Sequence, residues 1–172
     1  KPTIEAFTPQ KVEALIRVTK STNQPLRDLA IVLFLYDTGL RADEFCRMLI
    51  SDLEFDEHGG KVRVIGKGDK ERVVPFGRQA RIAIAEHLRP PGLKEGKRCN
   101  KRASQLLKAM KQEAPVAVGL KVWTSRVGAT AGSALTTSGL RRVFLRIGET
   151  ANIQGVRCSP HTMRHSFAIQ YL

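Results

Sequence analysis

The chain has 172 residues, of which 42% are hydrophobic, so it is long enough to bury the core of one ordinary domain. Lys and Arg outnumber Asp and Glu by 29 to 16, and the formal net charge of +13 makes nucleic acid the expected partner, ahead of an acidic membrane surface. The longest apolar run, Leu29 to Tyr36, is too short to cross a bilayer, and three cysteines without CxxC spacing argue against a disulfide framework and a zinc module.

Helix signals occupy the first part of the chain. Thr8 followed by Pro9 provides a cap and a first-turn proline, and apolar residues then recur at helical spacing. The segment Leu26 to Tyr36 is apolar nearly all round, which is typical of a helix through the middle of a domain. This helix should end at Gly39, which can take a left-handed C-cap. A new helix should begin at Arg41, which therefore sits on a turn between two buried helices.

The next part of the chain predicts a small antiparallel sheet. Residues alternate in polarity over Asp52–Phe55 and again over Lys61–Ile65, and a third strand is expected at Glu71–Pro75. Glycine-rich turns separate these segments. Lys67 lies in the second turn, Gly66–Lys70, where a solubilising turn lysine is the simplest interpretation. The predicted fold class is α+β, mostly helical with a small three-stranded antiparallel sheet.

Two basic segments follow a predicted helix at Arg78–Leu88. Between residues 89 and 111, eight cations accompany a single acid, which is compatible with a solvated loop but also extends a basic surface. The cations of this segment assigned to DNA binding are Lys97, Arg98, Lys101 and Arg102. Downstream of a short, presumed buried stretch around Trp123, a helix from Thr137 carries a clean apolar stripe, and the cations Arg141, Arg142 and Arg146 fall on its other faces. Such a helix suits DNA contact, although solvated arginines are also common.

The heptapeptide Ser159–His165 is the most informative stretch. Ser159 and Pro160 are a cap and a first-turn proline, so a helix should begin there. His161 and Arg164 then share one face near an end that favours anions, which predicts a phosphate-binding site. A capped helix with surface polar residues is the plainer alternative. Zinc is disfavoured because the spacing of His161 and His165 lacks the glutamate of metalloproteases and a third ligand.

Three motifs taken together resemble the tyrosine recombinases, which include phage integrases, resolvases of the Xer type and related transposases. These motifs are Thr38–Glu44, Gly66–Arg72 and His161–His165, and the resemblance covers residues 8–172, most of the family's catalytic domain. The resemblance implies DNA cleavage through a phosphotyrosine intermediate, without metal or other cofactor. Arg41 and Arg164 would stabilise charge on the phosphate oxygens.

The resemblance also implies roles for the other motif residues. Lys67 would protonate the leaving oxygen, and His161 would assist at the phosphate or act on the nucleophile. Glu44 would hold Arg41 or the hydrogen bonds of the site, and His165 would support it. Neither Tyr36 nor Tyr171 occupies the family's nucleophile position, so the nucleophile is expected beyond Leu172. The chain is then a catalytic domain spanning residues 1–172, without its tyrosine segment and the family's N-terminal DNA-clamp domain, and by itself inactive in cleavage.

The expected partners are double-stranded DNA and, in the full-length parent, other recombinase protomers that form a tetramer on DNA, with no membrane partner. The expected location is the cytoplasm of a bacterial cell, at the nucleoid, with a bacterial or phage gene. Three alternatives stay open: a DNA-binding accessory module of the same fold that makes no cut, a type IB topoisomerase, and a basic RNA-binding protein. The last leaves the Arg, Lys and His-x-x-Arg constellation unexplained.

Overall fold

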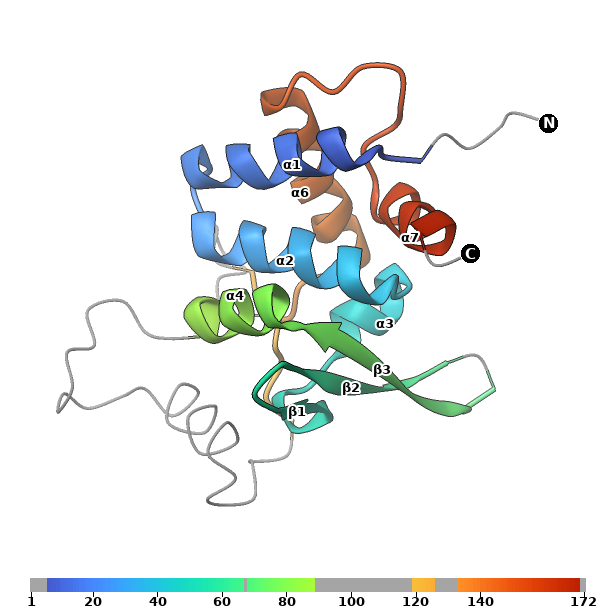
Figure 1. Cartoon of the computed structure of the whole chain (residues 1–172). Coiled ribbons are helices and arrows are strands. Elements are labelled where there is room, and N and C mark those ends of the chain that lie inside the picture. Colours follow the sequence, from blue (N-terminus) through green and yellow to red (C-terminus); the bar gives the residue numbers. More distant parts are fainter. Residues whose placement is uncertain (1–5, 67, 89–118, 126–132, 171–172) are drawn as a thin grey trace, which may run out of the picture.

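The computed structural model describes residues 6–66, 68–88, 119–125 and 133–170. Helices pack together above a small antiparallel sheet at one end of the molecule, which confirms the predicted mostly helical α+β class (Figure 1). The helices are α1 (Pro9–Val18), α2 (Pro25–Thr38), α3 (Ala42–Arg47), α4 (Arg78–Leu88), α6 (Thr137–Thr150) and α7 (Pro160–Gln170), with short 3-10 helices η1 (Thr19–Ser21) and η2 (Ile50–Asp52). The strands are β1 (Leu53–Phe55), β2 (Gly59–Ile65) and β3 (Glu71–Gly77).

The predicted helix ends are confirmed by their caps. Thr8 Oγ1 accepts a hydrogen bond from the backbone N–H of Lys11 at 3.3 Å, and Ser159 Oγ accepts one from the N–H of Thr162 at 3.1 Å. Each bond satisfies a first-turn donor that has no partner inside its helix. Gly39 ends α2 with φ of +55°, the left-handed conformation that glycine adopts without steric penalty.

Helix α2 is the centre of the fold, as its apolar composition predicted. Residues 30–35 of this helix are all buried, and it packs against α1, α4, α7 and β3. Figure 1 shows α2 between α1 and α4, with α7 near its C-terminal end. The end of α2 therefore lies where several elements meet, and the turn that follows it can present side chains to all of them.

The sheet has the order β1-β2-β3, and both pairs are antiparallel. Along β2, Val62 and Val64 are buried, whereas Arg63 and Ile65 are exposed, so one face of the sheet is turned to the core. The register places Val64 opposite Arg72. Residues directly opposite each other share a face, so Arg72 lies on the inner face of the sheet.

An aromatic cluster joins α2, α3, the sheet and the segment around Trp123. Phe34 packs against Phe76 with ring centroids 5.1 Å apart, and Phe45 stacks on Trp123 at 4.4 Å. Trp123 is fully buried, which confirms the short buried segment predicted there. Because Phe45 belongs to α3, this packing fixes the short α3 helix relative to α2 and the sheet.

The longest helices of the described ranges, α2 and α6, have 14 residues each. Within those ranges no helix is long and apolar enough to span a membrane.

Candidate active site

The turn between α2 and α3 presents the first predicted site residue, Arg41. Gly39 brings the chain out of α2, and its lack of a side chain leaves room for the ring of Phe167 on α7. Arg41 then precedes α3 with an extended backbone, and its N–H donates to Glu44 Oε2 at 2.9 Å. Glu44, three residues later, therefore closes the first turn of α3 as the glutamate of a capping box does.

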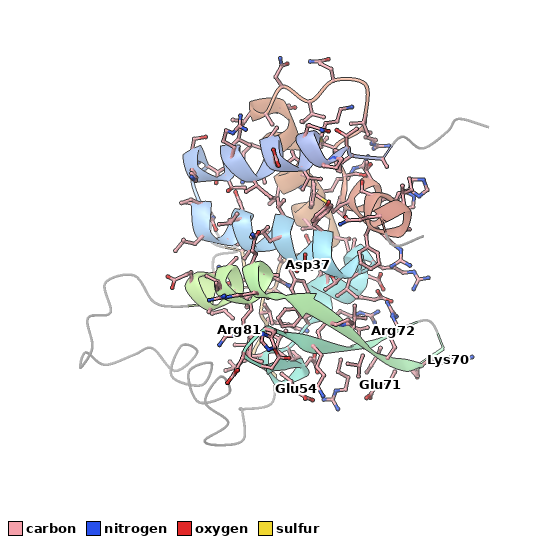
Figure 2. The ribbon with its side chains drawn as sticks, viewed as in Figure 1. Asp37, Glu54, Lys70, Glu71, Arg72 and Arg81 are labelled. Carbon is pink, nitrogen blue, oxygen red and sulfur yellow. The ribbon has the colours of Figure 1, made fainter. Side chains whose placement is uncertain are left out.

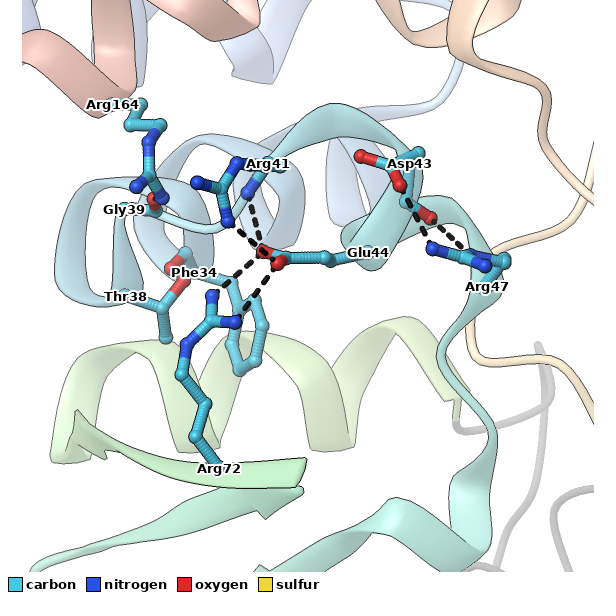
Figure 3. A network of polar contacts seen from close by, with 9 residues as sticks. All are labelled: Phe34, Thr38, Gly39, Arg41, Asp43, Glu44, Arg47, Arg72 and Arg164. Atoms are coloured by element: carbon cyan, nitrogen blue, oxygen red, sulfur yellow. Dashed lines mark hydrogen bonds and ion pairs between the residues drawn. The ribbon is translucent and has the colours of Figure 1, made fainter. Parts of the chain in front are cut away.

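Glu44 is the buried centre of the site, because its side chain is only 1% exposed. Its Oε1 accepts hydrogen bonds from Arg41 Nη1 at 3.2 Å and from Arg72 Nη1 at 2.9 Å. Its Oε2 accepts the Arg41 backbone bond and a further bond from Arg72 Nη2 at 2.8 Å. Figure 3 shows these contacts converging on the carboxylate. Arg72 thus binds Glu44 through both guanidinium nitrogens, whereas Arg41 uses only one.

The Glu44 carboxylate is held in its charged form. Burial alone would raise its pKa, but the hydrogen bonds from Arg72 and then from Arg41 outweigh burial and lower the pKa to about 2. The same contact raises the pKa of Arg72. At neutral pH the site therefore contains one carboxylate held between two guanidinium groups.

A third guanidinium reaches the site from α7. Arg164 Nη1 donates a hydrogen bond to the backbone carbonyl of Gly39, so α7 is tied to the turn that carries Arg41 (Figure 3). Burial, and then the positive charge of Arg41, lower the pKa of Arg164. An arginine nevertheless stays protonated in proteins, so Arg164 adds a partly buried positive charge to the site.

His161 lies on the exposed first turn of α7 and borders a cavity of about 890 Å³. Ala42, the residue after Arg41, lines the same cavity, and so do Arg141 and Arg142 of α6. The predicted phosphate-binding histidine and the predicted DNA-binding arginines of α6 therefore open onto one space beside the start of α3.

Arg146, predicted to lie off the apolar stripe of α6, is 42% exposed in the structure but also makes an internal contact. Arg146 Nη2 forms an ion pair with Asp28 Oδ2 at 2.6 Å, and Asp28 is fully buried in α2. The other oxygen of Asp28 binds Arg27 at 2.8 Å. One end of the Arg146 side chain therefore reaches a buried carboxylate, while the rest stays partly exposed. Arg141 and Arg142 are exposed, as predicted.

Several predicted site residues are not placed by the structure. Lys67 and the cations of the basic segment, Lys97, Arg98, Lys101 and Arg102, lie outside the described residues, as does Tyr171. His165 is partly exposed on α7. Across the described ranges, no group of three or more His, Cys, Asp or Glu side chains could hold a metal ion.

Two residues of the site were not assigned by sequence reasoning. Arg72 belongs to the motif Gly66–Arg72, but no local pattern indicates that it meets Glu44, which lies 28 residues earlier. Figure 2 shows Arg72 on β3 and Lys70 at the end of the β2–β3 hairpin. Arg157 lines the cavity beside His161 from the loop before α7, and its isolated position in the sequence gave no signal.

The arrangement is suited to binding a tetrahedral oxyanion such as phosphate. Arg41, Arg72 and Arg164 carry three positive charges against the single negative charge of Glu44. The Arg41 side chain is 54% exposed, and within the described ranges only its Nη1 binds a protein group. Planar guanidinium groups with unused N–H donors bind phosphate oxygens well.

Comparison with known proteins gives one consistent result. The model of the phage integrase family matches residues 5–172. Tyrosine recombinase XerC of Listeria welshimeri is 30% identical over 168 residues, which cover 96% of this chain and 48% of that protein. XerC of Corynebacterium glutamicum is 32% identical over 166 residues, which cover 95% of this chain and 44% of that protein. The chain thus spans about half the length of the curated relatives it matches.

Solved structures agree with this result. The XerA recombinase superposes with a TM-score of 0.68 at 26% identity, over 99% of this chain and 50% of that chain. The XerH site-specific recombinase bound to its palindromic difH substrate superposes with a TM-score of 0.67, over 96% of this chain and 41% of that chain. Its identity of 20% makes the second likeness one of fold alone.

Proposed function

The chain belongs to the phage integrase family of tyrosine recombinases, and from this premise we propose that it is the catalytic domain of a site-specific DNA recombinase or integrase. Its substrate is double-stranded DNA, one strand of which is cut and rejoined. The XerH and Tn1549 integrase structures contain DNA, which supports the same partner here. The net charge of +13 supports it independently.

The proposed reaction conserves the energy of the phosphodiester. A tyrosine oxygen attacks the scissile phosphorus, the bond from phosphorus to the 5′-oxygen breaks, and this oxygen leaves as a hydroxyl once it receives a proton. Attack by a 5′-hydroxyl on the phosphotyrosine reverses these steps and rejoins the strand. Negative charge builds on the non-bridging oxygens in both directions, so fixed positive donors are what this reaction needs most.

The observation that carries the proposal is the meeting of Arg41 and Arg164 at the α2–α3 turn. Arg164 binds the Gly39 carbonyl, and Arg41 follows two residues later. Both guanidinium groups lie close enough for the charge of Arg41 to depress the pKa of Arg164. Two guanidinium groups held this close together favour an anion between them, because its negative charge offsets theirs.

The remaining roles follow from the family resemblance. We assign His161 to proton transfer or hydrogen bonding at the phosphate, because it opens onto the cavity beside Arg41. Lys67 is assigned as the acid that protonates the leaving 5′-oxygen. Glu44 holds the Arg41 side chain, and His165 supports the site from α7.

The nucleophile is assigned to neither tyrosine of this chain. Tyr36 lies partly buried in α2, the central helix, and Tyr171 lies outside the described residues. We propose that the nucleophile is a tyrosine of another segment of the intact protein, and we expect the chain alone to bind DNA without forming a covalent adduct. In the intact protein we expect assembly with other protomers on DNA, at the nucleoid of a bacterial cell.

The experiment is a covalent-adduct assay on the intact protein. It is incubated with half-sites from its own element, nicked so that the released strand diffuses away, and protein linked to DNA is separated by denaturing electrophoresis. We expect an adduct that falls on the order of 100-fold in Arg41→Lys and Arg164→Lys, because a point charge lacks the planar fork of arginine. DNA binding should change little in both variants.

Arg47→Ala is the matched control, because Arg47 lies on α3 beside the site but, among the residues that the structure describes, its side chain forms an ion pair only with exposed Asp43. It should form adduct at the rate of the unchanged protein. If the intact protein binds these half-sites tightly yet forms no adduct, the chain is the non-cleaving DNA-binding module instead.

A further inference from the structure

We propose that Arg72 is a positioning residue for this reaction: by holding the buried Glu44 carboxylate, it keeps the Arg41 guanidinium available for the scissile phosphate. The inference rests on the proposed function, because it assigns a part in that reaction to a residue that would contact neither the DNA strand nor the nucleophile. The supporting observations are the contacts of Glu44, its burial and the space left for Arg72.

All the hydrogen-bond acceptor positions of the Glu44 carboxylate are occupied. An ionised carboxylate offers about four acceptor positions on its two oxygens. Arg72 occupies one position on each oxygen, at 2.9 and 2.8 Å. Arg41 takes the other two through its backbone N–H and through Nη1 at 3.2 Å. Arg72 therefore makes the stronger contact with Glu44, through two nitrogens, whereas the Arg41 side chain uses only one nitrogen.

Removing Arg72 would change what Arg41 does. Glu44 would keep a buried negative charge with two empty acceptor positions, and such a charge is costly unless another donor fills them. Arg41 already binds this carboxylate through Nη1, and its side chain is 54% exposed, so its unused N–H groups can turn toward the empty positions. Arg41 would then bind Glu44 through both nitrogens, as Arg72 does now, and its donors would be lost to the phosphate.

The local backbone makes space for this contact. Gly66, at the end of β2, has no side chain, and a Cβ there would lie 3.0 Å from Arg72 Nη1 and 3.6 Å from Glu44 Oε1. Arg72 lies opposite Val64 on the inner face of the hairpin, and from there its guanidinium reaches Glu44 on α3. Both strands of the hairpin thus contribute to the placement of one guanidinium.

The test compares Arg72→Ala, Glu44→Gln and the double variant in the intact protein, with Arg47→Ala as control. Adduct formation is measured on two half-sites, one with a normal scissile phosphate and one with a neutral methylphosphonate there, which needs less charge stabilisation. We expect Arg72→Ala to lose on the order of 100-fold on the phosphate, because small displacements of a reacting group have effects of this size. The loss on the methylphosphonate should be at most tenfold.

The double variant distinguishes positioning from simple structural support. With Gln at position 44 there is no carboxylate to draw Arg41 away, so adding Glu44→Gln to Arg72→Ala should recover activity about tenfold. Equal losses on the two substrates, additive losses in the double variant, or an Arg72→Ala rate equal to that of the control would each overturn the proposal. If the unchanged protein forms no adduct, it is the proposed function that fails.

A measurement on the 172-residue chain checks the contact without any cleavage. The pKa of Glu44 is followed by the NMR shift of its ¹³C-labelled carboxyl. It should rise in Arg72→Ala, because even a two-point contact from Arg41 leaves one guanidinium where there were two, but stay unchanged in Arg47→Ala. An unchanged pKa in Arg72→Ala overturns the inference. If Arg72→Ala does not fold, Arg72→Met takes its place, since it keeps the long stem but removes both hydrogen bonds to Glu44. An unchanged Glu44 pKa in Arg72→Met would overturn the inference equally.

Discussion

The turn that joins α2 to α3 should be sensitive to a single methyl group at Gly39. This residue has φ of +55°, where an added Cβ costs about 1–2 kcal/mol. The Cβ would also overlap with the ring of Phe167. Overpacking of this kind costs roughly 1–3 kcal/mol. We therefore expect Gly39→Ala to lower the free energy of unfolding by about 2–5 kcal/mol.

The chain offers a matched control in Gly68→Ala. Gly68 has φ of +74°, but no atom lies within 4 Å of the position its Cβ would take. Gly68→Ala should therefore lower the free energy of unfolding only by the cost of the left-handed backbone conformation, about 1–2 kcal/mol. Urea unfolding of the chain, followed by circular dichroism, measures the free energy of unfolding of both variants. The dependence of this free energy on urea concentration should be the same for both.

A second background isolates the packing part. In Phe167→Ala the ring is gone and only the Cβ of residue 167 remains, 3.1 Å from the added methyl group, so adding Gly39→Ala should cost little more than Gly68→Ala does. Equal losses for Gly39→Ala and Gly68→Ala in the unchanged background would refute the packing argument. An equally large loss of unfolding free energy from Gly39→Ala in the Phe167→Ala background would also refute it.

Three further predictions concern charge. Arg146→Ala should lower the free energy of unfolding by about 1.5–3 kcal/mol in urea unfolding, because it removes a charged hydrogen bond to buried Asp28; Arg142→Ala should change it by less than about 0.5 kcal/mol, and equal effects would contradict the internal ion pair. The pKa of Glu44 is about 2 in the folded chain and 4.5 in the unfolded chain, so the charged carboxylate stabilises the fold by up to roughly 3 kcal/mol. This stabilisation is complete above pH 4.5 and is lost as the pH falls through 2. Glu44→Gln should reduce the loss of unfolding free energy at acid pH, and an undiminished loss would contradict the assignment. Replacing Arg141 and Arg142 by Ala should reduce the log-log salt slope of DNA binding by about 0.9 for each phosphate contact, measured by fluorescence anisotropy, and an unchanged slope would exclude both from the DNA interface.

Most of the fold could be predicted from the sequence because its signals are local. Caps at Thr8 and Ser159 and the C-terminal Gly39 each act within one turn of their own helix, so the sequence beside them carries the information. The alternation that predicted the strands is also a property of neighbouring residues. In each case the structure agrees to within a few residues.

The contacts of the site could not be predicted in the same way. Arg72 meets Glu44 only because the hairpin folds back on α3, and Arg146 meets Asp28 only because α6 lies across α2. A helical wheel places Arg146 off the apolar stripe, but it does not say whether the neighbouring helix offers a carboxylate there. Which cation pairs with which acid depends on how the helices and strands pack together. The residues next to each cation in the sequence do not indicate this partner.

The positive site should work against the stability of the fold that carries it. Arg164 is partly buried among Arg41, Glu44 and Arg72, and its lowered pKa means that folding disfavours its charge. Replacing it with Met keeps the long stem and removes the charge, so the free energy of unfolding should hold or rise by about 1 kcal/mol, while adduct formation falls on the order of 100-fold. Arg27 is the comparison, because its charge is buried beside Asp28. Arg27→Met leaves that carboxylate one partner short and should destabilise by about 3–5 kcal/mol. Equal destabilisation of the two variants in urea unfolding would show that Arg164 serves the fold rather than the phosphate.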